Sequence, residues 1–266
     1  MCRLYENNVL PSLRFDVVTI FPNMFSVVMR DGVTGRAFQR RVATLNLIDP
    51  RAFAENAYRS VDDRPYGGGP GMVMMADPLG KAVAAAQQAR MAEGHHKGMV
   101  ILMSPRGKPL HDALVKHLLD CRGAILITCR YEGVDQRFID RAVDLEVSVG
   151  DYVLSGGELP AMTVIDAVVR QAPGVLGDCL SAVEESFVER LLDYPQFTRS
   201  RQWGEQDVPE VLLSGHHRNI QAWRRQMQLG HTWLRRPDLL QKQWLTDEEK
   251  SKLQDFRNAL KARYRL

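Results

Sequence analysis

The sequence is short of the features that mark several large protein classes. No apolar run approaches the roughly 20 residues that a membrane-spanning helix needs, and residues 1–12 lack the apolar core of a secretory signal. Cys2, Cys121, Cys129 and Cys179 have no metal-ligand spacing, so buried thiols in a reducing compartment are favoured over disulfides. We therefore expect a cytoplasmic protein with no membrane contact and no metal site.

Two common nucleotide-binding motifs are also absent. No G-x-G-x-x-G follows the first expected strand, and no G-x-x-x-x-G-K-[ST] occurs, which disfavours standard Rossmann and P-loop proteins. There are no internal repeats and no low-complexity segments. The 266 residues, 45% apolar and 25% charged, are those of an ordinary globular protein with one sizeable core and room for a second, smaller one.

Apolar runs alternate with helical patterns over the first two thirds of the chain. Asp77 is expected to cap its helix, with Pro78 at the first helical position. Near-continuous apolar strands separated by helices are typical of an α/β fold whose mostly parallel sheet is covered on both faces. Strands are expected at residues 15–21, 42–48, 98–104, 124–129 and 145–149, and helices at 77–92, 110–119, 134–142 and 158–171.

The α/β pattern ends after Gly174. The chain then becomes polar and irregular before helical patterns return at 218–229 and 247–263. We therefore expect an N-terminal extension (1–14), an α/β domain (15–176), an interdomain linker (177–195) and a small all-helical domain (196–266).

Charge is unevenly distributed along the chain. Residues 216–266 hold 12 Lys and Arg against 5 Asp and Glu, a net charge of +7, whereas the rest carries −4. A basic segment on a mildly acidic body suggests a polyanionic partner. A solvated helical face explains the charge equally well.

Glycine-rich loops carry the candidate chemistry. Residues 148–160 contain Gly150, Gly156 and Gly157 between an expected strand and an expected helix. Such a loop exposes backbone amides and carbonyls to a small ligand, and its lack of Lys and Arg favours a neutral or cationic ligand over a phosphate. The other motifs are Ser-Pro-Arg-Gly at 104–107, Cys-Arg-Tyr-Glu-Gly at 129–133 and Val-Asp-Asp-Arg-Pro-Tyr-Gly-Gly-Gly-Pro-Gly-Met at 61–72. Ligands of open α/β sheets bind at the carboxyl ends of strands, where three of these motifs are expected.

These motifs, in their order along the chain, resemble those of the bacterial tRNA (guanine-N1)-methyltransferases over about residues 15–237. The resemblance implies a knotted methyltransferase of the SPOUT type, in which the C-terminal part of the α/β domain forms a deep trefoil knot. It implies a homodimer with shared active sites, S-adenosylmethionine as methyl donor and a tRNA anticodon stem-loop as partner. The implied reaction methylates N1 of the guanosine 3′ of the anticodon (position 37).

By position, the family's cofactor contacts fall on the strand-end loops. A tight turn explains any single glycine among them, but the set at consecutive strand ends favours a ligand site. Cys129 stands where the family usually has Gly, so its side chain must point away from the ligand or narrow the pocket. The resemblance also implies Mg²⁺ dependence, although no cluster of metal ligands is visible. The implied cofactor residues are Ser104, Pro105, Gly107, Cys129, Glu132, Val149, Gly150, Asp151, Tyr152, Val153, Leu154, Gly156, Gly157 and Pro160.

Methylation of guanine N1 needs a base near N1 and a cation or donors near O6, where negative charge collects. The resemblance gives the O6 role to Arg170; locally, an ion pair with Asp166 is the simpler interpretation. It gives the base role to Glu185, where Asp is usual, with Glu184 as the fallback. Without the motif, both glutamates are interpreted as parts of a solvated acidic linker.

RNA contacts are expected on two parts of the chain. For Arg130, the alternative to an RNA contact is a surface ion pair with Glu132 or Asp135. Trp223 is expected in the core and not on an RNA-binding surface, because it has helical spacing from Ile220 and Met227. The implied RNA-binding residues are Asp62, Asp63, Arg64, Tyr66, Gly71, Arg130, Ser214, Gly215, His217, Arg235 and Arg236. Two alternative functions stay open: another knotted RNA methyltransferase, acting on a ribose 2′-hydroxyl or a ribosomal base, and a non-catalytic RNA-binding relative.

Overall fold

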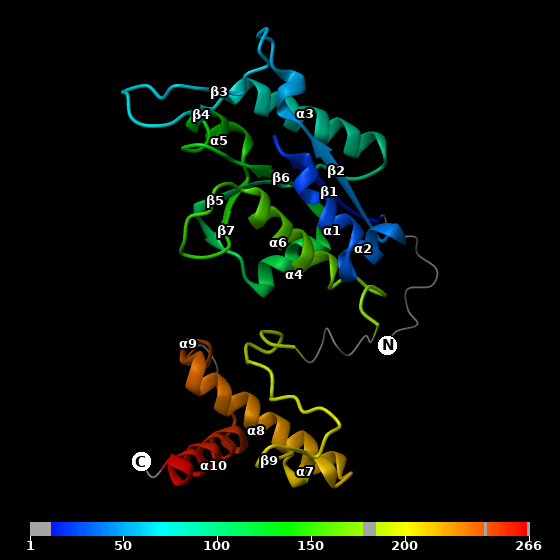
Figure 1. Ribbon diagram of the computed structural model, residues 1–266, viewed down its shortest axis with the longest axis vertical. Coiled ribbons are helices and arrows are strands. Elements are labelled where there is room, and N and C mark those ends of the chain that lie inside the picture. Colours follow the sequence, from blue (N-terminus) through cyan, green and yellow to red (C-terminus); the bar gives the residue numbers. More distant parts are fainter. Residues whose placement is uncertain (1–11, 178–184, 242–243, 265–266) are drawn as a thin grey trace. The chain divides into compact units, whose positions relative to one another are not determined.

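The computed structural model describes residues 12–177, 185–241 and 244–264 (Figure 1). They fall into two compact units that divide after residue 179. Within the described ranges, no helix combines the length and the apolar character needed to cross a membrane.

A parallel five-stranded sheet forms the centre of the first unit. All its neighbouring strands pair in parallel, in the order β2-β1-β6-β5-β7. This sheet confirms the predicted α/β class with a mostly parallel sheet. Its strands are β1 (Leu13–Val18), β2 (Ala43–Ile48), β5 (Val100–Pro109), β6 (Gly123–Thr128) and β7 (Leu145–Ser148).

Helices cover both faces of this sheet and create two apolar cores. One core joins α2 (Gly32–Gln39), α4 (Asp112–Asp120) and α6 (Glu158–Val169) to the face that carries Leu126. The other joins α3 (Ala76–Ala92) and α5 (Gln136–Ala142) to the opposite face. Alternate residues of one strand point to opposite faces, so a strand buried on both sides is mostly apolar, as β6 is before Thr128; β1 also buries Arg14 and Asp16, which pair with each other.

Short elements in the first unit were not predicted. They follow β1, surround the loop at 61–72 or precede it. They are η1 (Pro22–Phe25), α1 (Ser26–Arg30), η2 (Pro50–Phe53) and the antiparallel pair β3 (Asp62–Asp63) and β4 (Val73–Met74). The helix α2 was not predicted either.

Two local predictions in the first unit were wrong. The strand expected at 98–104 continues to the end of β5, with a shift in its register against β7 between Met103 and Lys108. The cap of α3 is Met75, which makes no side-chain cap hydrogen bond; Asp77 lies in the first turn and pairs with Lys81 at 2.8 Å. The i,i+4 ion pair thus replaces the expected cap.

The second unit consists of helices and a short hairpin. Its longest helices pack together, with Gly230 against the Phe256 ring: a Cβ on Gly230 would lie 2.3 Å from that ring. Arg225 on one of these helices pairs with Glu249 on the other. The elements are β8 (Gln202–Trp203), β9 (Gln206–Asp207), α7 (Glu210–Leu213), α8 (His217–Arg235), α9 (Pro237–Leu240) and α10 (Asp247–Tyr264).

Candidate active site

A pocket of about 410 Å³ opens beside residues 102–106 of β5 and at the carboxyl ends of β6 and β7. Gly107 and Asp151 do not line it: Gly107 packs on β7, where a Cβ would lie 2.3 Å from the Val147 nitrogen, and Asp151 is exposed. The predicted cofactor residues that line this pocket are Ser104, Pro105, Cys129, Glu132, Val149, Gly150, Tyr152, Val153, Leu154, Gly156, Gly157 and Pro160.

Glycines allow the loop after β7 to lie directly on the end of β6. The Gly157 N–H donates to the Cys129 carbonyl at 2.9 Å. A Cβ on Gly157 would lie only 2.8 Å from the Thr128 Cα, closer than real Cβ contacts come. Gly150 has a φ of 154°, which other residues rarely adopt. The pocket wall therefore depends on glycine for its shape.

Cys129 is one of the residues that line the pocket. Its thiol donates to the Met103 carbonyl at 3.2 Å, and burial raises the pKa of the thiol. Cys121 differs from the buried thiol that was expected, because it is exposed, with its sulfur 3.6 Å from His117 Nε2.

Sequence reasoning missed Glu158, which lies at the start of α6 and has a fully buried side chain. Its carboxylate pairs with Arg130 at 2.9 Å. Neither local partner considered for Arg130 is the right one, since Asp135 pairs with Arg137 instead. Only folding brings residues 130 and 158 together, so no local pattern could reveal the pair.

The motif at 61–72 is attached to the loop after β6 by backbone hydrogen bonds. Glu132 N–H donates to the Met72 carbonyl at 2.9 Å, and Met74 N–H donates to the Gly133 carbonyl at 2.9 Å. Gly71 has a φ of 77°, which favours glycine, and a Cβ there would displace the Glu132 carboxylate. The motif at 61–72, predicted to bind guanine, and the loop at 129–133, predicted to bind the cofactor, are therefore neighbours.

Tyr131 also lines the pocket and was not predicted as a site residue. Its φ of 61° is in the left-handed region, which is uncommon for a residue other than glycine. Burial, and then the negative charge of Asp62, raise the pKa of its phenol. Tyr131 thus connects the pocket with a predicted RNA-binding residue. Tyr66, by contrast, is fully exposed in the same motif.

The predicted catalytic residues belong to different units. Arg170 ends α6 in the first unit, and its N–H donates to the Asp166 carbonyl at 3.1 Å. Glu185 lies in the second unit, where its carbonyl accepts a long hydrogen bond from Val188 N–H. Glu184, the fallback base, is outside the described residues.

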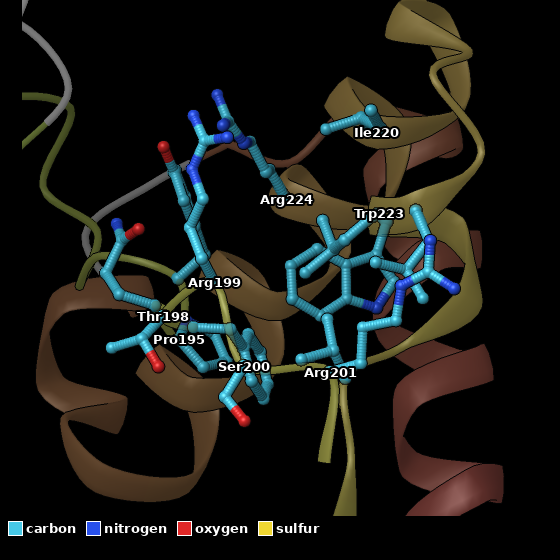
Figure 2. Close-up of a pocket in the computed structure, with 14 residues that line it drawn as sticks. Pro195, Thr198, Arg199, Ser200, Arg201, Ile220, Trp223 and Arg224 are labelled. Atoms are coloured by element: carbon cyan, nitrogen blue, oxygen red, sulfur yellow. The ribbon is translucent and has the colours of Figure 1, made fainter.

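The second unit has a pocket of its own, of about 400 Å³, between residues 194–201 and the helices α7 and α8 (Figure 2). The rings of Phe197 and Trp223 pack with their centroids 6.3 Å apart. Arg224 lies 4.6 Å from the ring centroid of Tyr194. Trp223 was expected in the core but is half-buried and lines this pocket, which joins aromatic rings with arginines.

The RNA-binding residues predicted in the second unit lie at two separate places. Ser214, Gly215 and His217 surround the start of α8, whereas Arg235 and Arg236 lie at its other end. A helix rises 1.5 Å per residue, so roughly 27 Å separate the two groups. Arg236 is paired with Asp238 at 2.8 Å. The structure does not gather these residues into one site.

No group of three or more His, Cys, Asp or Glu side chains placed to hold a metal ion occurs in the parts of the chain that the structure describes. Glu132 is the acidic residue that lines the pocket of the first unit.

The fold and the first pocket define a class: an α/β protein with a parallel sheet and a pocket among the glycine-rich loops that follow its strands, where ligands of open α/β sheets bind. The chain belongs to the tRNA (guanine-1)-methyltransferase family, TrmD, whose sequence model matches residues 13–242. This confirms the family that the motifs predicted.

Curated relatives match nearly the whole chain. The tRNA (guanine-N(1)-)-methyltransferase of Nitrosospira multiformis is 52% identical over 251 residues, which make up 93% of this chain and 98% of the relative. The protein of the same name from Aromatoleum aromaticum is 51% identical over 252 residues, 95% of this chain and 96% of the relative.

Proposed function

We propose that this protein transfers the methyl group of S-adenosylmethionine to N1 of the guanosine 3′ of the anticodon (position 37) in tRNA. The observation that carries the proposal is the pocket beside β5 and at the ends of β6 and β7, in a chain about half identical to tRNA (guanine-N(1)-)-methyltransferases. These relatives do not favour the alternatives, a ribose or ribosomal target and a non-catalytic role.

The first pocket fits a nucleoside-sized cation. Its volume of about 410 Å³ lies in the usual range for small-ligand sites. Apolar side chains of Val149, Leu154 and Pro160 would hold the adenosine, and the backbone of the glycine loop would bond to it. The Glu132 carboxylate lies in the same wall and favours a positive ligand. When bound, S-adenosylmethionine supplies an electrophilic methyl group on a sulfonium sulfur.

The catalytic roles follow from the charge that develops on guanine. Glu185 accepts the proton from N1, which makes N1 a nucleophile. Arg170 donates hydrogen bonds to O6 and stabilises the negative charge that collects there. Asp62, Asp63, Arg64, Tyr66 and Gly71 hold the guanosine, and the second unit holds the rest of the anticodon stem-loop through Ser214, Gly215, His217, Arg235 and Arg236.

The finer architecture is part of the same proposal. It comprises a deep trefoil knot within the α/β domain (15–176), preceded by an extension (1–14) and followed by a linker (177–195) and a small helical RNA-binding domain (196–266). The protein acts in the cytoplasm as a homodimer in which one subunit supplies the cofactor loops and the other supplies the linker. Family membership supports each of these features.

Transfer of labelled methyl from S-adenosylmethionine to an unmodified tRNA transcript tests the function. The transcript carries guanosine 3′ of the anticodon, and a matched transcript carries adenosine there. Label on the guanosine transcript alone supports the proposal. Label on both, or on neither, contradicts the proposed target. Repeating the assay with EDTA tests the implied Mg²⁺ dependence.

A further inference from the structure

A buried carboxylate adjoins the glycine loop of the first pocket. Glu158 is 0% exposed, so its charge must be compensated by the protein. One of its oxygens accepts a hydrogen bond from the Thr19 hydroxyl at 3.2 Å and lies 3.3 Å from the Thr128 hydroxyl, which donates to the Val18 carbonyl at 2.9 Å. The other accepts one from Arg130 Nε at 2.9 Å. The carboxylate therefore gathers groups that follow two neighbouring strands, β1 and β6.

Arg130 extends this network to the loop after β7. Its Nη1 donates to the Ser155 carbonyl at 3.0 Å. Its guanidinium carbon lies 4.6 Å from the centroid of the Phe21 ring, a cation–π contact. The side chain is only 17% exposed. One guanidinium thus connects the segment after β1, the start of α6 and the glycine loop.

The glycine loop lies directly against this guanidinium. A Cβ on Gly156 would be 2.2 Å from Arg130 Nε, so the backbone at 156 passes where no side chain fits. Ser155, Gly156 and Gly157 all line the pocket. The position of the Arg130 side chain therefore determines the position of this wall of the pocket. The Glu158 carboxylate is the charged group that holds the Arg130 side chain in place.

We propose that Glu158 and Arg130 are positioning residues: the buried pair holds the loop at 150–157 in its ligand-binding shape and so determines affinity for the methyl donor. The inference rests on the proposed function, which identifies that donor. It also gives Arg130 a role in the protein wall in place of the RNA contact predicted from the sequence.

The principal test is Glu158→Gln, which preserves the size of the side chain and one acceptor oxygen but removes the charge. The variant is titrated with S-adenosylhomocysteine by calorimetry, without RNA. We expect Kd to rise roughly 10- to 100-fold, the usual effect of leaving a buried charged group unpaired. In methyl transfer, KM for the donor should rise while kcat at saturating donor and KM for tRNA stay within about twofold.

A matched control separates positioning from general destabilisation. Asp16 is another buried carboxylate of the sheet unit, paired with Arg14 at 2.9 Å and with Arg90 at 3.0 Å, and it does not line the pocket. Asp16→Asn should lower the melting temperature but leave Kd for S-adenosylhomocysteine unchanged. If both variants weaken binding equally, the effect is one of global stability and the proposal is overturned.

A double variant asks whether the two residues act as one unit. The Arg130→Met variant has no guanidinium for the Glu158 carboxylate to pair with. Adding Glu158→Gln to it should therefore change Kd for S-adenosylhomocysteine by less than about twofold. Additive effects would overturn the pairing. An Arg130→Met variant with normal Kd but a raised KM for tRNA would restore the RNA-contact role. Wild-type protein that does not bind S-adenosylhomocysteine would overturn the proposed function, and the inference with it.

Discussion

Two pockets of nearly equal size, about 410 and 400 Å³, are built in opposite ways. The pocket of the first unit lies beside β5 and at the ends of β6 and β7, and glycine backbone shapes its wall. The pocket of the second unit is lined by exposed or half-buried side chains, among them Phe197, Trp223 and Arg224. Similar volumes therefore serve different chemistry: fixed backbone suits one small ligand, whereas aromatic rings and arginines suit a polyanion with stackable bases.

The difference in construction predicts a difference in sensitivity. In the first pocket, Gly157 lies against backbone atoms of Thr128 and Cys129, and a substitution there must move a strand end that two apolar cores hold in place. Side chains of the second pocket can be truncated with less effect on the backbone around them. Substitutions in the first pocket should therefore weaken ligand binding by displacing the backbone. Substitutions in the second pocket should weaken it by removing individual side-chain contacts.

The largest effect is expected at the two proposed catalytic residues, Arg170 and Glu185. Arg170→Ala and Glu185→Ala should each lower single-turnover methyl transfer by roughly 10²- to 10⁴-fold, because each removes stabilisation made in the transition state. Affinity for S-adenosylhomocysteine, measured by calorimetry, should stay within about twofold. Full activity of Glu185→Ala would show that the base is assigned wrongly, and Glu184→Ala would then be the variant to measure.

The next effect concerns the backbone-built pocket. Gly157→Ala places a Cβ 2.8 Å from the Thr128 Cα, which forces the loop off the end of β6. Overpacking of this kind costs about 1–3 kcal/mol, so we expect a roughly 10- to 100-fold loss of affinity for S-adenosylhomocysteine.

Gly80 provides the control for Gly157, because it lies in α3 with nothing within 4 Å of its added Cβ. Gly80→Ala should raise the free energy of unfolding by about 0.5–1 kcal/mol and leave ligand affinity unchanged. Equal ligand affinity in both variants would mean that the glycine loop does not shape the site.

A smaller effect is expected in the side-chain pocket. Phe197→Ala should weaken tRNA binding by about 1–3 kcal/mol if a base stacks there, without changing affinity for S-adenosylhomocysteine. Filter binding at fixed salt measures the first quantity. Trp203, 83% exposed on β8 and outside the pocket, provides the control variant Trp203→Ala. If both variants lost the same tRNA affinity, the pocket would contribute no more to tRNA binding than an exposed residue outside it.

The smallest effect is a pH dependence confined to the second unit. Burial disfavours the charge on Glu249, but hydrogen bonds from the Thr246 N–H and from Arg225 outweigh it and lower the pKa of Glu249. A lowered pKa stabilises the fold above the unfolded value, near 4.3, and the stabilisation disappears as pH falls through the folded pKa. Because the pair is partly exposed, we expect about 1 kcal/mol at most.

Denaturant unfolding followed by tryptophan fluorescence measures this dependence, since all 4 tryptophans belong to the second unit. Stability should decline between about pH 5 and pH 3 in the wild type, and less in Glu249→Gln. The same decline in both proteins would assign the acid sensitivity to other groups.

The sequence predicted what periodicity and family motifs encode, and it missed what only folding brings together. Apolar runs placed the strands and the sheet class, and motifs located most of the pocket wall. Local reasoning mistook Asp77 for a cap because its partner Lys81 competes for it. The family resemblance assigned Gly107 to the ligand site, whereas the register shift of β5, which has no local signal, packs Gly107 on β7 and outside the pocket lining.

Long-range pairing explains the remaining misses. Glu158 looks like an ordinary acid in the first turn of a helix until Thr19, Thr128 and Arg130 are seen around it. Trp223 has the spacing of a core residue, but the neighbouring segment leaves its ring in a pocket. The roles predicted for Arg170 and Glu185 stay predictions, to be decided by their variants.

The hydrogen bonds that join residues 72–74 to residues 132–133 also limit how the chain can vary. Glu132 N–H donates to the Met72 carbonyl, Met74 N–H donates to the Gly133 carbonyl, and Gly71 leaves space for the Glu132 side chain. One residue inserted or deleted within 72–74 or within 132–133 would shift the backbone groups that follow it, so that they no longer face their hydrogen-bond partners on the other loop. The length of this segment should therefore be held constant over evolution more strictly than most of its individual residues.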